Sequence, residues 1–349
     1  MKKIAAFYFF FLPLLLSAQS ASRFVYLVGD AGEDTTAGPA LLRLKEELNS
    51  HSKSTVLFLG DNVYPNGLKK GDRISEKHLL SQLQLLNDFP GQAYIVPGNH
   101  DWDGQKRTGL DRLKDEQDFV EAYMQTATTV ANRSAGSFFP KNGLPGPASV
   151  MADPKLRLVL IDTQWFLQFY KKNVNGSKKK TISEFYARLD SLLSFSKAHG
   201  ETVIVAAHHP MYTNGQHSKS RQPWRFLINR TPFQLFGLLG LDRLYSQDID
   251  QPRYKKMRKK MLGIFSKYDN VIYVSGHDHN LQCFREGSTR YIVSGAGSKL
   301  SHLQKKKRFD SVFQDDSRTG FIRLELKEDG AVETTIFQSG APEKKLEGF

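Results

Sequence analysis

Residues 55–64 read TVLFLGDNVY, and this stretch sets the pattern for the whole fold. A short apolar run, Thr55–Gly60, passes directly into the polar side chains of Asp61, Asn62 and Tyr64. Short apolar and β-branched runs of this kind are typical of buried strands. A glycine at the end of the run lets the backbone turn sharply and approach a bound group. The stretch therefore predicts a buried strand followed by a loop that carries polar donors.

The same alternation recurs along the chain. Strands are predicted at Arg23–Gly29, Thr55–Gly60, Ala93–Pro97, Leu156–Asp162, Thr202–Ala207, Val271–Ser275 and Arg290–Ser294. Helices are predicted between them at Gly38–Asn49, Ser75–Leu86, Gly109–Thr126, Ile182–Ala198 and Pro252–Tyr268. This order favours an α/β architecture with several parallel pairings. Near the end of the chain, Phe321–Lys327 and Ala331–Gln338 predict an antiparallel edge hairpin.

Polar side chains follow five of these strands directly. The loops are Gly29–Gly32, Gly60–Tyr64, Gly98–Asp101, Ala207–Pro210 and Gly276–Asn280. Loops at the carboxyl ends of strands in α/β sheets converge on one edge, where ligands and catalytic groups gather. Each loop offers oxygen or imidazole donors, so the five together indicate one shared site.

These five blocks resemble the signature of calcineurin-like metallophosphoesterases, and more narrowly of purple (tartrate-resistant) acid phosphatases. Gly32 stands where most of the superfamily has a histidine ligand, and Tyr64 stands where purple acid phosphatases have a metal-binding tyrosine. The runs GHDHNLQ, which begins at Gly276, and YIVSGAGSK, Tyr291–Lys299, are also similar to that group. The resemblance implies two stacked β-sheets flanked by helices, an αββα sandwich.

The resemblance further implies two metal ions held by seven residues. The implied ligands of one ion are Asp30, Tyr64 and His279. Those of the other are Asn99, His208 and His277, and Asp61 bridges both ions. The donor chemistry agrees, because phenolate and carboxylate suit a trivalent ion, whereas imidazole and amide oxygen suit a divalent one. The expected cofactor is Fe(III) with divalent Fe, Zn or Mn.

The implied activity is hydrolysis of phosphate monoesters by metal-bound hydroxide, as in acid phosphatases. His100 resembles a histidine that contacts the substrate phosphate and assists the leaving group, and His217 resembles a second histidine near a substrate oxygen. Simpler roles stay open: His100 as a hydrogen-bonding neighbour of the metal ligands, and His217 as an ordinary loop residue. A phosphodiesterase or nucleotide pyrophosphatase with the same metal pair is the alternative activity. A polyanion or membrane-surface binder would require a decayed site, and the ligand set is complete.

Composition supports a folded globular protein. The chain has 349 residues, of which 40% are hydrophobic and 24% charged, an ordinary globular composition. Its single cysteine, Cys283, excludes an internal disulfide and is predicted to fill the core. The net charge of +13 is concentrated in the runs Lys178–Lys180, Lys255–Lys260 and Lys305–Arg308. Solvated loops and helix faces explain these runs, and a field that attracts anionic substrates or binds polyanions is the alternative. Aromatic residues do not interleave with the runs, so no specific nucleic-acid partner is expected.

The N-terminus has the plan of a secretory signal peptide. Lys2 and Lys3 precede an apolar run, Ile4–Leu16, and small residues follow. The run is shorter than the about 18 residues that span a bilayer. We therefore predict a signal peptide over residues 1–20 and a secreted or periplasmic protein, which we expect to be a monomer.

The remainder is predicted to be one catalytic domain, residues 21–340, with a tail at 341–349. Residues 218–251 are predicted to form an insertion that contains the apolar island Phe233–Leu241. The island is interpreted as a packed helix or a flap, and membrane contact is less favoured because the island is short. The basic stretch Lys171–Lys180 is predicted to be an exposed loop.

Overall fold

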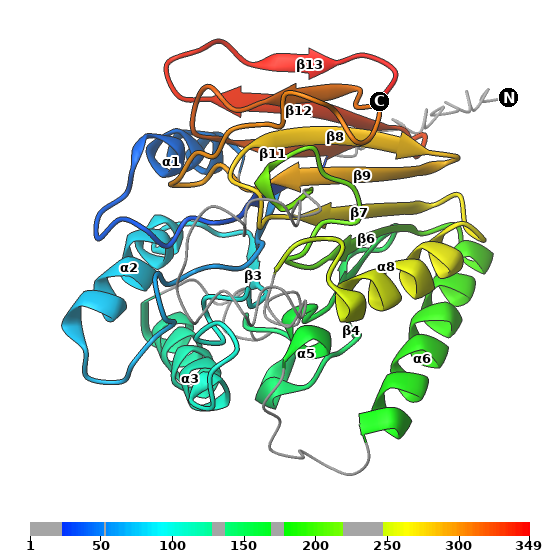
Figure 1. The fold of residues 1–349 in the computed structure, drawn as a ribbon. Coiled ribbons are helices and arrows are strands. Elements are labelled where there is room, and N and C mark those ends of the chain that lie inside the picture. The colour runs from blue at the N-terminus through cyan, green and yellow to red at the C-terminus, as the bar shows by residue number, and fades with distance from the viewer. Residues whose placement is uncertain (1–22, 52–53, 128–136, 169–177, 219–246) are drawn as a thin grey trace, which may run out of the picture.

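Two mixed β-sheets packed face to face form the centre of the molecule, and helices cover their outer faces (Figure 1). The computed structural model describes residues 23–51, 54–127, 137–168, 178–218 and 247–349. From edge to edge the first sheet contains β13 (Lys344–Leu346), β12 (Val332–Gln338), β11 (Gly320–Leu326), β1 (Arg23–Val28), β2 (Ser54–Phe58) and β3 (Gln92–Ile95). The second contains β10 (Phe313–Asp315), β8 (Leu281–Glu286), β9 (Thr289–Ser294), β7 (Val271–Ser275), β6 (Thr202–Ala206), β5 (Leu156–Leu160) and β4 (Ala148–Asp153). The predicted two-sheet αββα fold is confirmed.

The helices separate into two groups. The longer ones are α1 (Pro39–Ser50), α2 (Arg73–Leu83), α3 (Gly109–Ala127), α6 (Lys178–Ala198) and α8 (Pro252–Phe265), and the short α5 (Gln164–Leu167) lies near α8. α1 packs on β11 and β12 of the first sheet, whereas α6 packs on β6 of the second sheet and on α8. Figure 1 shows α2 and α3 on the same side of the molecule as α1, across from α6 and α8.

The strands alternate between two apolar layers. In β1, Val25 and Leu27 belong to the cluster between the sheets, whereas Tyr26 and Val28 belong to the cluster under the helices. All four side chains are fully buried. Strands buried on both faces read as continuous apolar runs, because each face needs apolar residues. This is why the short runs were visible in the sequence.

Parallel pairing brings the polar loops to one edge. β1 pairs in parallel with β2, and β2 with β3. In the other sheet, β5, β6, β7 and β9 are parallel neighbours. The carboxyl ends of β1, β2, β3, β6 and β7 carry the five predicted loops. Both sheets therefore contribute to one site.

Some details differ from the predictions. The hairpin β11–β12 is present but is not the edge of its sheet, because β13 pairs with β12. The predicted tail at 341–349 thus contains a strand, and Phe349 is buried with only 2% of its surface exposed. Lys178–Lys180, predicted to be loop, begin α6.

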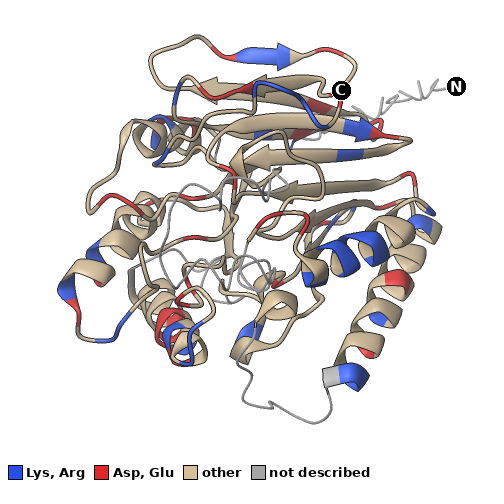
Figure 2. Cartoon of the chain, viewed as in Figure 1, with Lys and Arg blue, Asp and Glu red and all other residues tan. Residues whose placement is uncertain are grey.

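Other predictions fall partly outside the described residues. The signal peptide at 1–20, residues 171–177 and the insertion from 219 to 246 lie there. Cys283 is fully buried, as predicted. Among the residues described, no helix combines the length and apolar character needed to cross a bilayer. The basic run at 255–260 lies on α8 (Figure 2), where its lysines are exposed and Met257 is buried.

Candidate metal centre

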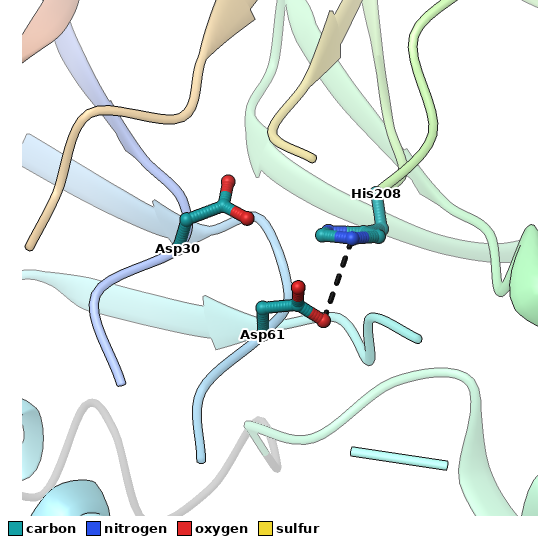
Figure 3. Close-up of side chains that lie close together, drawn as sticks. All are labelled: Asp30, Asp61 and His208. Atoms are coloured by element: carbon teal, nitrogen blue, oxygen red, sulfur yellow. Dashed lines mark ion pairs between the residues drawn. The ribbon is translucent and has the colours of Figure 1, made fainter. Parts of the chain in front are cut away.

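Asp30, Asp61 and His208 converge where the two sheets meet (Figure 3). Asp30 and Asp61 follow β1 and β2 of the first sheet, and His208 follows β6 of the second. One donor atom from each lies within 4.8 Å of the other two, and all three side chains are buried. His208 Nε2 lies 3.4 Å from Asp61 Oδ1. Buried carboxylates facing an imidazole form a group suited to a cation.

Asn99 and His277 join His208 on one side of Asp61. Asn99 Oδ1 lies 3.0 Å from His208 Nε2 and 2.9 Å from His277 Nδ1. The two imidazole nitrogens, His277 Nδ1 and His208 Nε2, lie 3.2 Å apart. Two nitrogens and an amide oxygen so close together, with Asp61 Oδ1 beside them, fit the ligand preference of a divalent ion.

Tyr64 is at the centre of a second group on the other side of Asp61. Its phenol oxygen lies 3.1 Å from Asp30 Oδ1, 3.1 Å from Asp61 Oδ2 and 3.1 Å from His279 Nε2. His279 Nε2 lies 3.6 Å from Asp30 Oδ1. The structure therefore brings all seven predicted ligands together, and each carboxylate oxygen of Asp61 faces one of the two groups.

The electrostatics of this cluster fit a bound cation. Burial, together with the Asp61 carboxylate, raises the pKa of Asp30 well above its usual range. Burial and the carboxylates of Asp30 and Asp61 raise the pKa of Tyr64 as well. Burial disfavours charge on His208, but the carboxylates outweigh it and raise its pKa to about 9. Burial and mutual repulsion disfavour the anionic forms of these oxygen donors. Positive ions between the donors would stabilise those anionic forms.

The backbone is strained where the ligands leave the strands. Asp30, Asp61 and His277 have φ angles of 57°, 55° and 73°, in the left-handed region that non-glycine residues rarely adopt. Such strain persists only where surrounding structure over-determines it, typically at functional sites. The backbone at Gly98 also lies very close to the ligands, because a Cβ there would collide with Asp61 Oδ1.

Hydrogen bonds behind the ligands orient them. The Asp101 carboxylate accepts the N–H groups of Asp61 at 2.9 Å and Gly98 at 2.7 Å, which fixes two of the loops. His208 donates from Nδ1 to Leu59 O at 2.9 Å, so Nε2 faces Asn99. His277 donates from Nε2 to a backbone oxygen, Gln247 O, at 3.0 Å, which leaves Nδ1 for the cluster. Bonds of this kind fix the tautomer of a metal-binding histidine.

The two predicted catalytic histidines line a cavity of about 580 Å³ above the cluster. His100 donates from Nδ1 to Pro65 O at 2.6 Å, and its side chain is 35% exposed. His217 packs on His277, with ring centroids 4.1 Å apart. Other lining residues include Gln105, Lys106, Gln216 and Gln247.

Three residues near the site were not identified from the sequence. Gln247 bonds to His277, and Asp248 Oδ1 lies 3.2 Å from His217 Nδ1. The Lys299 ammonium lies 3.8 Å from the centroid of the Tyr64 ring. Gln247 and Asp248 had no motif to identify them, whereas Lys299 stood in the run YIVSGAGSK but without a role.

A comparison with known families agrees with this geometry. Residues 25–281 match the calcineurin-like phosphoesterase family, which is more than half of the chain. The chain belongs to this family. Among curated sequences, this calcineurin-like phosphoesterase is similar to purple acid phosphatases 7 and 17 of Arabidopsis thaliana, at 24% identity over 252 residues and 23% over 256 residues. These matches include 71% and 70% of the chain, and 62% and 58% of the two plant proteins. The chain thus spans less than two thirds of their length.

The phosphoesterase also resembles glideosome-associated protein 50 of Plasmodium falciparum, at 22% identity over 93% of this chain and 76% of that protein. A solved structure of GAP50, described as the anchor in the inner membrane complex of Plasmodium, is also similar. The match covers 93% of this chain and 88% of the GAP50 chain, with a TM-score of 0.58 at 19% identity. A dimetal phosphatase from Danio rerio covers 93% and 98%, with a TM-score of 0.51 at 13% identity. At these identities the structural likeness concerns the fold.

Proposed function

We propose that the chain hydrolyses phosphate monoesters, as an acid phosphatase does, with Fe(III) and divalent Fe, Zn or Mn. The observation that supports this most is the position of Tyr64, whose oxygen lies 3.1 Å from both Asp30 and Asp61. In this proposal Asp30, Tyr64 and His279 hold the Fe(III) ion. Asn99, His208 and His277 hold the divalent ion, and Asp61 is shared. When bound, such a metal pair supplies Lewis-acid activation of the phosphate ester and of water.

His100 and His217 are proposed to act on the substrate from the cavity. Nδ1 of His100 donates to Pro65 O, so the ring can give a proton from Nε2 only as the doubly protonated imidazolium, and that form is proposed to protonate the departing alcohol. Nδ1 of His217 donates to Asp248, and as the doubly protonated imidazolium the ring is proposed to donate from Nε2, which lies 3.4 Å from the Gln216 amide nitrogen, to a phosphate oxygen. Neither residue needs to form a covalent bond to the substrate.

The cavity gives some support to a second activity. Its volume of about 580 Å³ exceeds what a phosphate group requires, and amide side chains line part of it. A phosphodiester or a nucleoside diphosphate would place its additional group there. We propose that the protein acts on small phosphorylated molecules rather than on nucleic acid. We also propose that it is exported and monomeric.

A substrate panel on metal-reconstituted protein tests the proposal. We expect p-nitrophenyl phosphate to be cleaved with a higher kcat/KM than bis(p-nitrophenyl) phosphate or ADP. The reverse order would establish the second activity. We also expect a visible absorption band from the tyrosine–iron pair. A Tyr64→Phe protein that retained this band would contradict the assignment of Tyr64.

A further inference from the structure

One arginine holds both ends of the insertion. Arg308 Nη1 donates to Ser218 O at 2.8 Å and to Asp250 Oδ2 at 2.9 Å. Arg308 Nη2 donates to Asp250 Oδ1 at 2.9 Å. A two-pronged arginine–carboxylate pair fixes direction as well as distance. Ser218 and Asp250, the first and the next-to-last residues of the predicted insertion, are therefore both hydrogen-bonded to one guanidinium.

Arg308 is itself held firmly. The side chain of Asn214 accepts the N–H groups of Arg308 and Phe309, both at 2.9 Å, and donates to Phe309 O at 2.8 Å. The guanidinium lies over the Phe309 ring, 5.3 Å from its centroid. Because Asn214 belongs to the loop region after β6, Arg308 is fixed relative to the strand that carries His208.

The three residues before Asp250 contact the candidate metal centre. Ile249, only 2% exposed, donates its N–H to His217 O at 3.0 Å. Asp248 Oδ1 lies 3.2 Å from His217 Nδ1, and Gln247 O accepts from His277 Nε2 at 3.0 Å. Three consecutive residues thus contact two histidines of the site. Since the two rings stack on each other, displacing one displaces the other.

We infer that Arg308 is a positioning residue for His217 and His277. By tying Ser218 to Asp250, it keeps Asp248 and Gln247 against the two rings. Arg308 touches neither ring itself, so its effect travels through Asp250 and the residues before it. The catalytic part of this inference rests on the proposed phosphatase activity, whereas the structural part does not.

Arg308→Ala and a matched control test the inference. The control is Arg285→Ala, because Arg285 also donates to a backbone oxygen, Gly348 O, and lies over an aromatic ring, that of Phe349. Arg285 is exposed and is the next-to-last residue of β8. With p-nitrophenyl phosphate, we expect R308A to lower kcat/KM about tenfold, as loss of an outer partner of a metal site does. R285A should behave as wild type, and Arg308→Lys should recover only part of the loss because it lacks the fork.

Two further measurements separate positioning from general weakening. R308A should speed amide hydrogen exchange at residues 247–250, and R285A should leave that exchange unchanged. In addition, R308A combined with Asp248→Asn should lose no more activity than the worse single variant, because both act through one route. Wild-type exchange at 247–250 in R308A, or additive losses in the double variant, would overturn the inference. A wild-type protein inactive on p-nitrophenyl phosphate would refute the proposed function instead, and the exchange measurement would still decide the role of Arg308.

Discussion

The ammonium group of Lys299 lies 3.8 Å from the centroid of the Tyr64 ring and 2.5 Å from Glu33 Oε2. A cation over a ring stabilises its electrons, and the effect is larger for a phenolate than for a phenol. Lys299 therefore favours the anionic, phenolate form of Tyr64, in which Tyr64 is proposed to bind metal. It also lowers the energy of the electrons that a tyrosine–iron absorption band would excite.

Replacing Lys299 by methionine is expected to shift that visible band to longer wavelength. Without the cation, the phenolate electrons lie higher and require less energy for transfer to iron. Absorption spectroscopy of the iron-reconstituted variant measures the shift. Lys344→Met is the control, since Lys344 lies over the Phe313 ring, 5.1 Å from its centroid, away from the metal centre. A band at the wild-type position in K299M would refute the contact.

Asp61→Asn is expected to prevent the binding of two metal ions. The amide removes one negative charge and replaces an oxygen by NH₂, so one of the two groups loses its shared donor. Elemental analysis should find at most one ion per chain, and kcat/KM should fall on the order of 100-fold or more. Asp118→Asn, an exposed position of α3, should retain both ions. Two tightly held ions in D61N would contradict the bridging role.

Deprotonation of His208 is expected to raise metal affinity with pH up to about 9. The pKa of His208 in the metal-free protein is raised to about 9, so below that pH the ring holds a proton that a metal must displace. From this group alone, the affinity for Zn²⁺ should fall about tenfold for each pH unit below 9. Competition with a chelator at several pH values measures it. An affinity that is constant between pH 7 and 9 would contradict the displacement of a proton from His208 by the metal.

Gly98→Ala is expected to weaken metal binding at least about tenfold, because the new methyl group would displace Asp61 Oδ1. Gly263→Ala in α8 is the control. A Cβ at Gly263 meets no atom within 4 Å, and alanine favours a helix over glycine by about 1 kcal/mol. Isothermal titration with Zn²⁺ distinguishes the two proteins. Equal affinities would mean that the loop accommodates the methyl group.

Leu158→Ala is expected to destabilise the protein by about 2–5 kcal/mol, because it leaves a cavity between the sheets. Leu42→Ala, on the exposed face of α1 where leucine is 53% exposed, should cost less than about 1 kcal/mol. Urea unfolding of the metal-free proteins gives the difference. Equal stabilities would show that the inter-sheet layer is not a tightly packed core.

The sequence predicted this fold well where a strand is buried on both faces. β7, Val271–Ser275, was predicted at its observed bounds because its first four residues, VIYV, are apolar or aromatic and a polar loop follows the strand. β8 was missed because its last two residues, Arg285 and Glu286, are exposed and polar, and β13 was missed because Lys344 and Lys345 are exposed. Both strands pair with a neighbour in sequence, β8 with β9 and β13 with β12, but their exposed polar residues break the apolar pattern by which a strand is recognised.

The same distinction applies to the site. Asp30, Asp61 and His277 were identifiable because each follows a strand and a glycine. Asp248 contacts His217 across 31 positions with no fixed spacing, and its partner segment is held by Arg308 from yet another part of the chain. Such contacts depend on how loops pack together, so only the folded structure reveals them.

Asp61 and Asn99 extend from one sheet of the sandwich, whereas His208 and His277 extend from the other. A metal ion bound by these four residues would link the two sheets, and neither sheet alone carries a complete set of donors. Tight metal binding should therefore require that the two sheets have packed against each other. Chelation should loosen the seam between the sheets before it affects the outer helices.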